Sequence, residues 1–370
     1  MNDKFKGFCL NGTERFNPGA SIAVERNASI VERDTPEPGE GEILARTLYT
    51  SICGSDVSAC MGKPNFDWIQ RPRIIGHETC AEVVKLHPDY RGNLKPGDRF
   101  VPVAQLGCRK DDCPGCRAGK WNLCPDKTIL GYHRDGAFGQ MMTLEADRAL
   151  PLAKGLEPWF GAIVEPLSVA VNAVYSKCSI KPGMNVLVTG CGIMGLMAAE
   201  LARASGAEVA ITGIDLDKGF RLKAAKERGF AAIVVSETKP LLAQLSKGVR
   251  SSTGATFGEK GKVDLLIECS GIPQALAEAI YAVKPEHDVC IIATYPHAAE
   301  LDVTHITRQS LNLKGVMGSS KDNFLVAMEL LRRNVFPAKH YMDIYGFSHI
   351  EQAFRDSIRA RNVKAVIKMD

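Results

Sequence analysis

Three glycines join an apolar run to an apolar, helix-forming segment in VLVTGCGIMGLMAAELARASG, residues 186–206. Gly190, Gly192 and Gly195 have the spacing G-x-G-x-x-G. The first glycine permits a tight turn, the second lets a pyrophosphate approach the backbone, and the third lets helix and strand pack closely. The phosphates then face the positive N-terminus of the helix, at Ile193 and Met194. The stretch therefore predicts a dinucleotide-binding turn between a strand and a helix.

An acidic residue is expected about 20 residues later, at the end of the next strand, to bind the adenosine ribose. Asp215 is the candidate, and an acid there favours NAD over NADP, which is not excluded. Because Gly213 stands where the strand is expected to end, Asp215 lies one step beyond the ideal point. Asp217 is interpreted instead as a surface helix cap. Arg221 either reaches the adenine ribose or a 2′-phosphate, or is a solvated helix arginine.

Strands and helices alternate through the second half of the chain. Strand-like runs such as 185–189 and 287–295 are separated by helix-like runs, which predicts a parallel, doubly wound sheet. Residues 20–105 consist of short apolar runs broken by Pro and Gly, which predicts a β-rich unit. The C-terminal residues give two helices and a last strand that returns to it. We therefore expect an α/β protein with a β-rich domain over 1–168 and 308–370 and a dinucleotide-binding domain over 169–307.

Four cysteines stand within GCRKDDCPGCRAGKWNLC, residues 107–124: Cys108, Cys113, Cys116 and Cys124. Zinc takes four ligands at tetrahedral corners, and thiolate sulfur is a preferred donor. Four protein ligands leave no open position, so this loop predicts a structural zinc site. The alternative interpretation, free surface thiols, leaves four oxidisable groups in one loop.

The chain contains twelve cysteines, and we expect it to lie in a reducing compartment. In such a compartment scattered cysteines are most often small buried residues. We interpret seven in this way: Cys9, Cys60, Cys80, Cys178, Cys191, Cys269 and Cys290. No apolar run approaches the roughly 18 residues of a membrane helix, and no signal peptide is recognised, so a cytoplasmic location is expected. The formal net charge of +4, without a basic run, predicts no nucleic-acid surface.

A second group of potential metal ligands comes from three separate segments. SICGSD contains Cys53 and Ser55, IIGHET contains His77 and Glu78, and IVEPLSVAV contains Glu165. A Cys, a His and a carboxylate around zinc leave a position for water or substrate, which is the arrangement of a catalytic site. Such an ion stabilises an alkoxide, from which hydride can leave to a nicotinamide. Taken singly, each residue has a structural alternative: a buried cysteine, a core histidine or a glutamate at a helix start.

CGSD, GHE, the four-cysteine loop, GDRF, EPLSVAV and GCGIMG occur in the order found in the zinc-dependent medium-chain dehydrogenases. The chain resembles this family over about residues 28–368, and most closely its group of sorbitol, threonine and related polyol or sugar dehydrogenases. The resemblance implies a GroES-like β-rich catalytic domain, an inserted Rossmann coenzyme domain, and a homodimer or homotetramer. It also implies two zinc ions per chain, one catalytic and one structural.

The same resemblance implies roles for individual residues. Cys53 and His77 match the catalytic zinc ligands, and Glu78 and Glu165 match the two carboxylates near the metal. Which carboxylate ligates at rest is left open. Ser55 matches the hydroxyl that takes the proton of the substrate alcohol.

Several positions depart from the family pattern. Ser58 stands where a relay His is common, and Cys108 is separated from the next cysteine by four residues where the family usually has two. Gly318 and Ser319 stand where sorbitol dehydrogenases tend to have an Arg-Tyr pair, which disfavours sorbitol itself. Trp68 either lines the substrate cleft or packs in the core.

The expected function is zinc-dependent oxidation of a secondary hydroxyl of a polyol, cyclitol or sugar, with hydride transfer to NAD(P). A threonine or amino-alcohol dehydrogenase is the alternative enzyme, although we identify no groups for the ammonium and carboxylate. A simple alcohol dehydrogenase is disfavoured by Glu165, where that branch usually has Cys. The non-enzyme alternative is a catalytically silent NAD-binding protein. The retention of a complete open metal site argues against that alternative.

Overall fold

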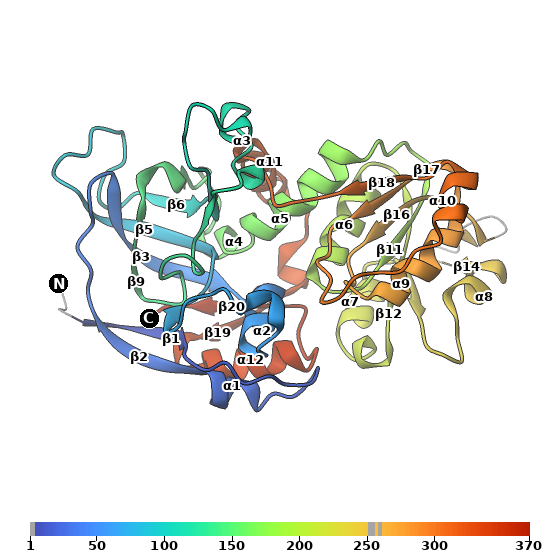
Figure 1. Cartoon of the computed structure of the whole chain (residues 1–370), viewed down its shortest axis with the longest axis horizontal. Coiled ribbons are helices and arrows are strands. Elements are labelled where there is room, and N and C mark those ends of the chain that lie inside the picture. Colours follow the sequence, from blue (N-terminus) through green and yellow to red (C-terminus); the bar gives the residue numbers. More distant parts are fainter. Residues whose placement is uncertain (1–3, 251–255, 258–260) are drawn as a thin grey trace. The chain divides into compact units, whose positions relative to one another are not determined.

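The computed structural model describes residues 4–250, 256–257 and 261–370 (Figure 1). The chain divides into two compact units. Unit 1 comprises residues 1–168, 318–334 and 342–370, and unit 2 comprises residues 169–317 and 335–341. No helix within the described ranges is long and apolar enough to cross a membrane.

Unit 2 is built on one parallel sheet. Its strands are β11 (Asn185–Thr189), β12 (Glu208–Gly213), β13 (Ala231–Val234), β16 (Val263–Glu268), β17 (Val283–Ile291) and β18 (Asn312–Gly315), in the order β13-β12-β11-β16-β17-β18. The helices of this unit are α6 (Ile193–Ala204), α7 (Arg221–Glu227), α8 (Leu241–Ser246), α9 (Pro273–Ala279) and α10 (Val303–Gln309). A short hairpin pairs β14 (Val249–Arg250) with β15 (Thr256–Phe257). This is the predicted doubly wound sheet.

The sequence of the central strand explains why the sheet is buried on both faces. Val186, Leu187 and Val188 of β11 are each fully buried, as expected for a parallel strand covered by crossover helices. Helix α6 packs against β11 and β12, and α7 packs against β12 and β13. The predicted second domain boundary, after residue 307, falls inside unit 2, because β18 still pairs with β17 in this sheet.

Unit 1 is built mainly on a seven-stranded sheet. Its strands are β3 (Glu42–Ser51), β5 (Glu78–Leu86), β6 (Arg99–Pro102), β9 (Met141–Glu145), β10 (Ala149–Pro151), β19 (Met342–Gly346) and β20 (Lys364–Lys368). All neighbouring strands pair antiparallel except β19 and β20, which pair parallel. A second sheet has the order β2-β1-β4, with β1 (Lys4–Leu10), β2 (Ala28–Asp34) and β4 (Arg73–Ile74). Strand β20 pairs antiparallel with β3, so the C-terminal segment returns to the β-rich unit as predicted.

Short helices and one small strand pair complete unit 1. The helices are α1 (Ala23–Asn27), α2 (Gly54–Cys60), α3 (Pro114–Arg117), α4 (Pro158–Gly161), α11 (Lys321–Arg332) and α12 (Ile350–Ile358), and α5 (Val164–Val171) leads from unit 1 into unit 2. Strand β7 (Gln105–Leu106) pairs with β8 (Thr128–Ile129). Both flank the four-cysteine loop and hold its two ends together.

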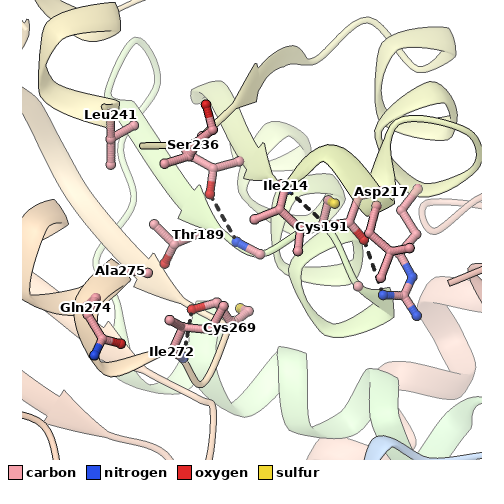
Figure 2. Close-up of a pocket in the computed structure, with 18 of the residues that line it drawn as sticks. Thr189, Cys191, Ile214, Asp217, Ser236, Leu241, Cys269, Ile272, Gln274 and Ala275 are labelled. Carbon is pink, nitrogen blue, oxygen red and sulfur yellow. Dashed lines mark hydrogen bonds and ion pairs between the residues drawn. The ribbon is translucent and has the colours of Figure 1, made fainter. Parts of the chain in front are cut away.

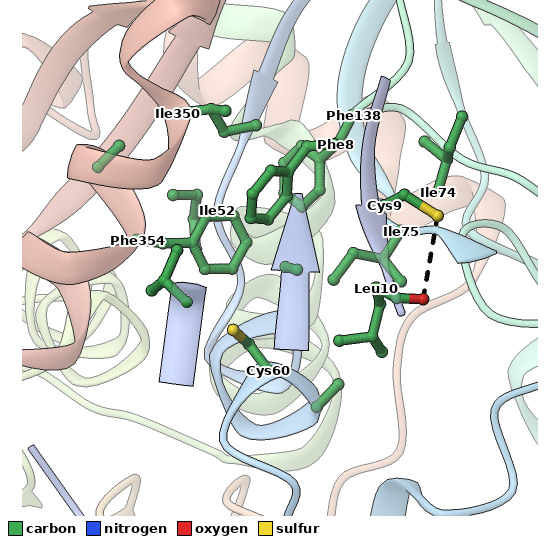
Figure 3. Packing of buried hydrophobic residues seen from close by; sticks show 14 of the residues in the cluster. Phe8, Cys9, Leu10, Ile52, Cys60, Ile74, Ile75, Phe138, Ile350 and Phe354 are labelled. Carbon is green, nitrogen blue, oxygen red and sulfur yellow. Dashed lines mark hydrogen bonds between the residues drawn. The ribbon is translucent and has the colours of Figure 1, made fainter. Parts of the chain in front are cut away.

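Three phenylalanines from distant parts of the chain form the centre of one unit 1 core cluster (Figure 3). The ring of Phe8 on β1 lies 4.8 Å from the ring of Phe354 on α12 and 6.4 Å from that of Phe138. All three side chains are fully buried. Because aromatic rings contribute large buried areas and favour such tilted and edge contacts, this cluster fixes both chain ends of the unit to its middle.

Candidate active site

Three side chains predicted to ligate metal converge in unit 1. One ligand atom each of Cys53, His77 and Glu78 lies within 4.8 Å of the others. Cys53 is the residue before α2, while His77 and Glu78 stand at the start of β5. The antiparallel pairing of Ser51 with Glu78 brings the end of β3 beside the start of β5. The sheet register therefore brings together residues that are separate in the sequence.

The two oxygens of Glu78 have different surroundings. Oε2 accepts hydrogen bonds from Ser51 and from Lys364 of β20, and these contacts are buried. Oε1 is buried without a hydrogen-bond partner in the described parts of the chain. A buried carboxylate oxygen without a donor is costly unless a cation takes that position. Hydrogen bonds therefore fix Oε2 of Glu78, while Oε1 is left to bind a cation.

Asp56 orients the other two members of the group. Its Oδ2 accepts the backbone N–H of Cys53 at 3.0 Å, and its Oδ1 lies 3.6 Å from Nδ1 of His77. A carboxylate beside one imidazole nitrogen is the usual support of a metal-ligating histidine. Burial lowers the pKa of His77, but the charges of Asp56 and Cys53 outweigh it and leave this pKa well above its ordinary value. Burial raises the pKa of Asp56 to about 6, against the effect of His77.

Glu165 lies nearby on α5 but does not belong to the group of three. Burial is the main cause that raises its pKa to about 7, the charge of His77 lowers it, and the charge of Glu78 raises it. Its carboxylate is therefore close enough to both residues to interact with their charges. The carboxylate next to Cys53 and His77 in this structure is that of Glu78.

Ser55 of α2 contacts a tyrosine that the sequence motifs do not contain. The hydroxyl of Tyr132 donates a hydrogen bond to Oγ of Ser55 at 2.6 Å and lies 3.3 Å from Oδ1 of Asp56. No local pattern predicts this contact, because the two hydroxyl-bearing residues are 77 positions apart. Trp68, a candidate for the substrate cleft, is 49% exposed, and its ring meets the edge of Tyr132 at 5.8 Å.

The four-cysteine loop forms a second group of potential ligands. The sulfur atoms of Cys108, Cys113, Cys116 and Cys124 lie within 4.8 Å of one another. The sulfur atoms of Cys108 and Cys116 are 3.9 Å apart, and those of Cys113 and Cys124 are 3.7 Å apart. Tetrahedral zinc with bonds of about 2.3 Å places its sulfur atoms about 3.8 Å apart. The longer spacing after Cys108 therefore does not keep this residue from the group.

Backbone amides point at two of these sulfurs. The N–H of Cys108 donates to Sγ of Cys124 at 3.3 Å, and the N–H of Arg109 donates to Sγ of Cys116 at 3.4 Å. Arg109 adopts a positive φ of 61°, which turns its amide into the loop. Burial raises the pKa of Cys124, but the hydrogen bonds from Cys108 and its neighbours lower it to about 7 overall. These hydrogen bonds therefore stabilise the thiolate of Cys124.

The predicted dinucleotide turn borders a cavity of about 470 Å³ in unit 2 (Figure 2). Gly190 has a φ of +90°, which only glycine adopts without strain, and Gly192 precedes α6. A Cβ on Gly195 would lie 1.8 Å from the carbonyl oxygen of Gly190, so this glycine allows the helix to approach the strand. Gly190 and Gly192 line the cavity, whereas Ile193, Met194 and Gly195 form the first turn of α6 behind it.

Asp217 and Glu278 are the acidic residues in the lining of this cavity, and the predicted Asp215 is not part of the lining. Asp215 lies outside the cavity lining, is 69% exposed, and pairs with Lys218 at 2.5 Å. Residues 215–217 form a single helical turn after β12, which turns Asp215 outward and Asp217 inward. Oδ2 of Asp217 accepts the N–H of Ile214 at 3.1 Å, and Oδ1 lies 3.3 Å from the guanidinium of Arg221, which also lines the cavity (Figure 2).

The seven cysteines that we interpreted as small buried residues are buried, with one exception. Those that are buried are Cys9, Cys60, Cys80, Cys178, Cys191 and Cys290. Cys269 is only partly buried, because it follows β16 and lines the cavity.

Gly318 and Ser319 precede α11, and Oγ of Ser319 lies 2.6 Å from Oγ of Ser168. Ser319 is thus bound within unit 1.

Both halves of the chain match known families. Residues 39–154 match the alcohol dehydrogenase GroES-like domain, and residues 194–333 match zinc-binding dehydrogenase. The L-threonine 3-dehydrogenase of Pyrococcus horikoshii is 32% identical over 299 residues, which cover 79% of this chain and 80% of that protein. The chain belongs to the zinc-dependent medium-chain dehydrogenases. The expected GroES-like and Rossmann-type fold is thereby confirmed.

Two further known proteins are similar to almost the whole chain. The L-galactonate-5-dehydrogenase of Escherichia coli K12 is 26% identical over 91% of this chain and 94% of that protein. The crystal structure of a protein described as a short chain alcohol dehydrogenase from Escherichia coli CFT073, complexed with NADH, matches 99% of this chain and 100% of its own chain with a TM-score of 0.82 and 23% identity. The latter supports the dehydrogenase fold across both units.

Proposed function

We propose that this protein is a zinc-dependent oxidoreductase that transfers hydride between a secondary hydroxyl of a polyol, cyclitol or sugar and NAD(P). The observation that carries the proposal is the convergence of Cys53, His77 and Glu78 in unit 1. The family match and the L-galactonate-5-dehydrogenase of Escherichia coli, whose name gives a sugar acid as substrate, support the substrate class. A catalytically silent protein would have no need of three convergent ligand groups.

The catalytic zinc fits the residues present. Cys53, His77 and Glu78 would hold it, because Oε1 of Glu78 lacks a donor and Asp56 supports the imidazole from its Nδ1 side. Burial, and then the charge of Glu78, raise the pKa of Cys53, so a cation is needed to keep its thiolate. Glu165 is the second carboxylate of the site. The four-cysteine loop would hold a second, structural zinc, for a total of two per chain.

The chain's own residues supply the positioning and the proton transfer. When bound, zinc supplies a Lewis acid for the substrate hydroxyl, and nicotinamide supplies a hydride acceptor. Asp56 holds the backbone N–H of Cys53 and places a carboxylate 3.6 Å from Nδ1 of His77, and Lys364 holds one oxygen of Glu78. During oxidation Ser55 accepts the proton of the substrate hydroxyl at Oγ while its own hydroxyl hydrogen passes to water, and both transfers reverse during reduction. Ser58 offers no imidazole for a further transfer.

NAD is the proposed dinucleotide, bound across Gly190 and Gly192. The carboxylate of Asp217 lines the cavity, where it would accept hydrogen bonds from ribose hydroxyls and repel a 2′-phosphate. Arg221 is already engaged by Asp217, which supports this choice. From the family resemblance we also propose a cytoplasmic homodimer or homotetramer.

Threonine is the second candidate substrate. The relative at 32% identity is an L-threonine 3-dehydrogenase, and threonine carries a secondary hydroxyl next to its amino acid groups. The open site at Cys53, His77 and Glu78 would accept either class of alcohol, because both threonine and the polyols, cyclitols and sugars carry the reacting CH–OH group.

An oxidation panel tests the proposed function. The zinc-loaded protein is incubated with NAD⁺ or NADP⁺ and with polyols, inositols, aldoses, galactonate or threonine, and the reduced nucleotide is measured by its absorbance. Turnover of a polyol, cyclitol or sugar with NAD⁺ is expected. Turnover confined to threonine would favour the second candidate, and no turnover with any substrate and either nucleotide would contradict both.

A further inference from the structure

Tyr132 lies between β8 and β9, outside every motif that identifies the family members. Its side chain is 5% exposed, and its hydroxyl donates to Oγ of Ser55 at 2.6 Å. The same hydroxyl lies 3.3 Å from Oδ1 of Asp56, the carboxylate that supports His77. The phenol oxygen therefore touches both residues of α2 that face the reacting centre.

The ring of Tyr132 is held from several sides. It meets the ring of His77 at a centroid distance of 5.3 Å, that of Phe66 at 6.1 Å and that of Trp68 at 5.8 Å, with interplanar angles of 61° to 86°. Its backbone N–H donates to the carbonyl of Ile129 at 3.2 Å. A ring fixed in this way places its hydroxyl with little freedom, so the contact with Ser55 is preorganised.

A serine hydroxyl has one hydrogen and two lone pairs, and it rotates unless a partner fixes it. The hydrogen bond from Tyr132 occupies one lone pair of Ser55. The second lone pair is then left to accept the proton of the substrate hydroxyl in oxidation, while the serine's own hydrogen passes to water. Reduction reverses both transfers. Without Tyr132 the side chain of Ser55 would sample other rotamers, and a smaller fraction of bound substrate would meet a correctly directed acceptor.

We propose that Tyr132 is a positioning residue that orients the hydroxyl of Ser55 for proton transfer. The proposal rests on the proposed dehydrogenase function and adds to it a residue that no sequence motif identifies. Tyr132 acts through Ser55, so its contribution disappears when Ser55 is removed.

A double-mutant cycle tests this inference. Tyr132→Phe keeps the ring and removes only the hydroxyl, and it is compared with Ser55→Ala and with the double variant. Loss of one orienting hydrogen bond is expected to lower kcat about tenfold, with KM for the alcohol changed by less than about twofold. In the Ser55→Ala background the same change is expected to have no effect on kcat. Tyr345→Phe, which removes a hydroxyl bound to Asp356 at 3.2 Å, is the matched control and keeps wild-type kcat.

Zinc content, measured on all variants, separates action on Ser55 from action on the metal ligands through Asp56. Two zinc ions per chain are expected in Tyr132→Phe. An unchanged kcat in Tyr132→Phe, an equal loss in both backgrounds, or a loss of zinc would overturn the inference while wild-type turnover preserves the proposed function. An equal loss in both backgrounds is also the result that a folding defect would give. Absence of turnover in the wild-type enzyme would overturn the function and the inference together.

Discussion

The ammonium group of Lys364 forms an ion pair with the carboxylate of Glu78 inside unit 1, where the two side chains are 2% and 1% exposed. Lys364 also donates to the carbonyl oxygen of Ile52 at 2.9 Å. One candidate zinc ligand is therefore held by the last strand of the chain, β20. This contact connects the stability of the unit to the geometry of its metal site.

Replacement of Lys364 by Met is expected to destabilise the zinc-free protein. Removing one partner of a buried ion pair leaves the other charge uncompensated, which costs about 3–5 kcal/mol. Zinc would replace part of the lost positive charge, so the loss should be smaller in the zinc-loaded protein. Thermal unfolding with and without zinc measures both values. Lys368→Met, an exposed lysine of the same strand, is the control, and an equal loss in the two metal states would contradict this account.

Asp217→Asn is expected to reduce the preference for NAD⁺ over NADP⁺. The substitution removes the negative charge of Asp217 from the cavity lining and keeps a side-chain oxygen for the N–H of Ile214. The ratio of kcat/KM for the two nucleotides should therefore fall by about tenfold or more, equal to about 1.4 kcal/mol. Asp215→Asn serves as the control, because this residue lies outside the cavity. A change in preference with Asp215→Asn alone would restore the assignment made from sequence.

The difference between Asp215 and Asp217 illustrates where sequence reasoning reached its limit. The strand, the glycine turn and the helix follow from apolar runs and glycine spacing, and all are present in the structure. The side chain that faces the cavity depends on a single helical turn at residues 215–217, whose phase no periodicity predicts. Two residues along this 3₁₀ turn rotate the side-chain direction by about 240°, so Asp215 and Asp217 point to different sides.

The candidate active site likewise combines residues that the sequence motifs predict with residues that only the tertiary structure reveals. Cys53, His77 and Glu78 were predicted because each stands in a short motif whose residue types suit zinc. Tyr132 and Lys364 were missed, since their contacts span 77 and 286 positions and arise only from tertiary packing. Asp56 stands inside the motif CGSD, next to the predicted Ser55, and a carboxylate there was the available signal.

Cys108→Ser is expected to lower the zinc content from two ions to one per chain. Serine is a poor replacement for thiolate as a zinc ligand, and a closed site of four thiolates tolerates the loss of one badly. The variant should also unfold at a lower temperature than the wild-type protein. Elemental analysis and thermal unfolding are the measurements, with Asp111→Asn in the same loop as the control. A variant that retained both zinc ions would show that Cys108 is not a ligand.

Glu145→Gln is expected to flatten the acid dependence of stability. Burial raises the pKa of Glu145, but the hydrogen bond from Arg148 and the charges of Arg148 and Arg134 outweigh it and leave the pKa below its ordinary value. A carboxyl with a lowered folded-state pKa stabilises the protein above its unfolded pKa, about 4.3 for glutamate, and loses this contribution as the pH falls through the folded value.

Denaturant unfolding of the wild type and Glu145→Gln over the acid range measures this effect. The variant should be the less stable protein near neutral pH, because Arg148 is fully buried and loses its charged partner. The difference between the two proteins should shrink below about pH 4. Glu40→Gln, at an exposed position, should follow the wild type throughout. A constant difference between wild type and Glu145→Gln at every pH would show that the carboxylate does not act through its charge.

The rate of NAD⁺ reduction by Cys53→Ser, with a substrate that the wild-type protein oxidises, tests the central claim most directly. A Lewis acid contributes several kcal/mol to such a reaction, so the variant is expected to lose at least about 100-fold in kcat/KM. Cys60→Ala, a buried cysteine of the neighbouring helix α2 that belongs to neither ligand group, should keep the wild-type rate. A folded Cys53→Ser variant with an unchanged rate would contradict zinc-assisted chemistry at the site of Cys53, His77 and Glu78.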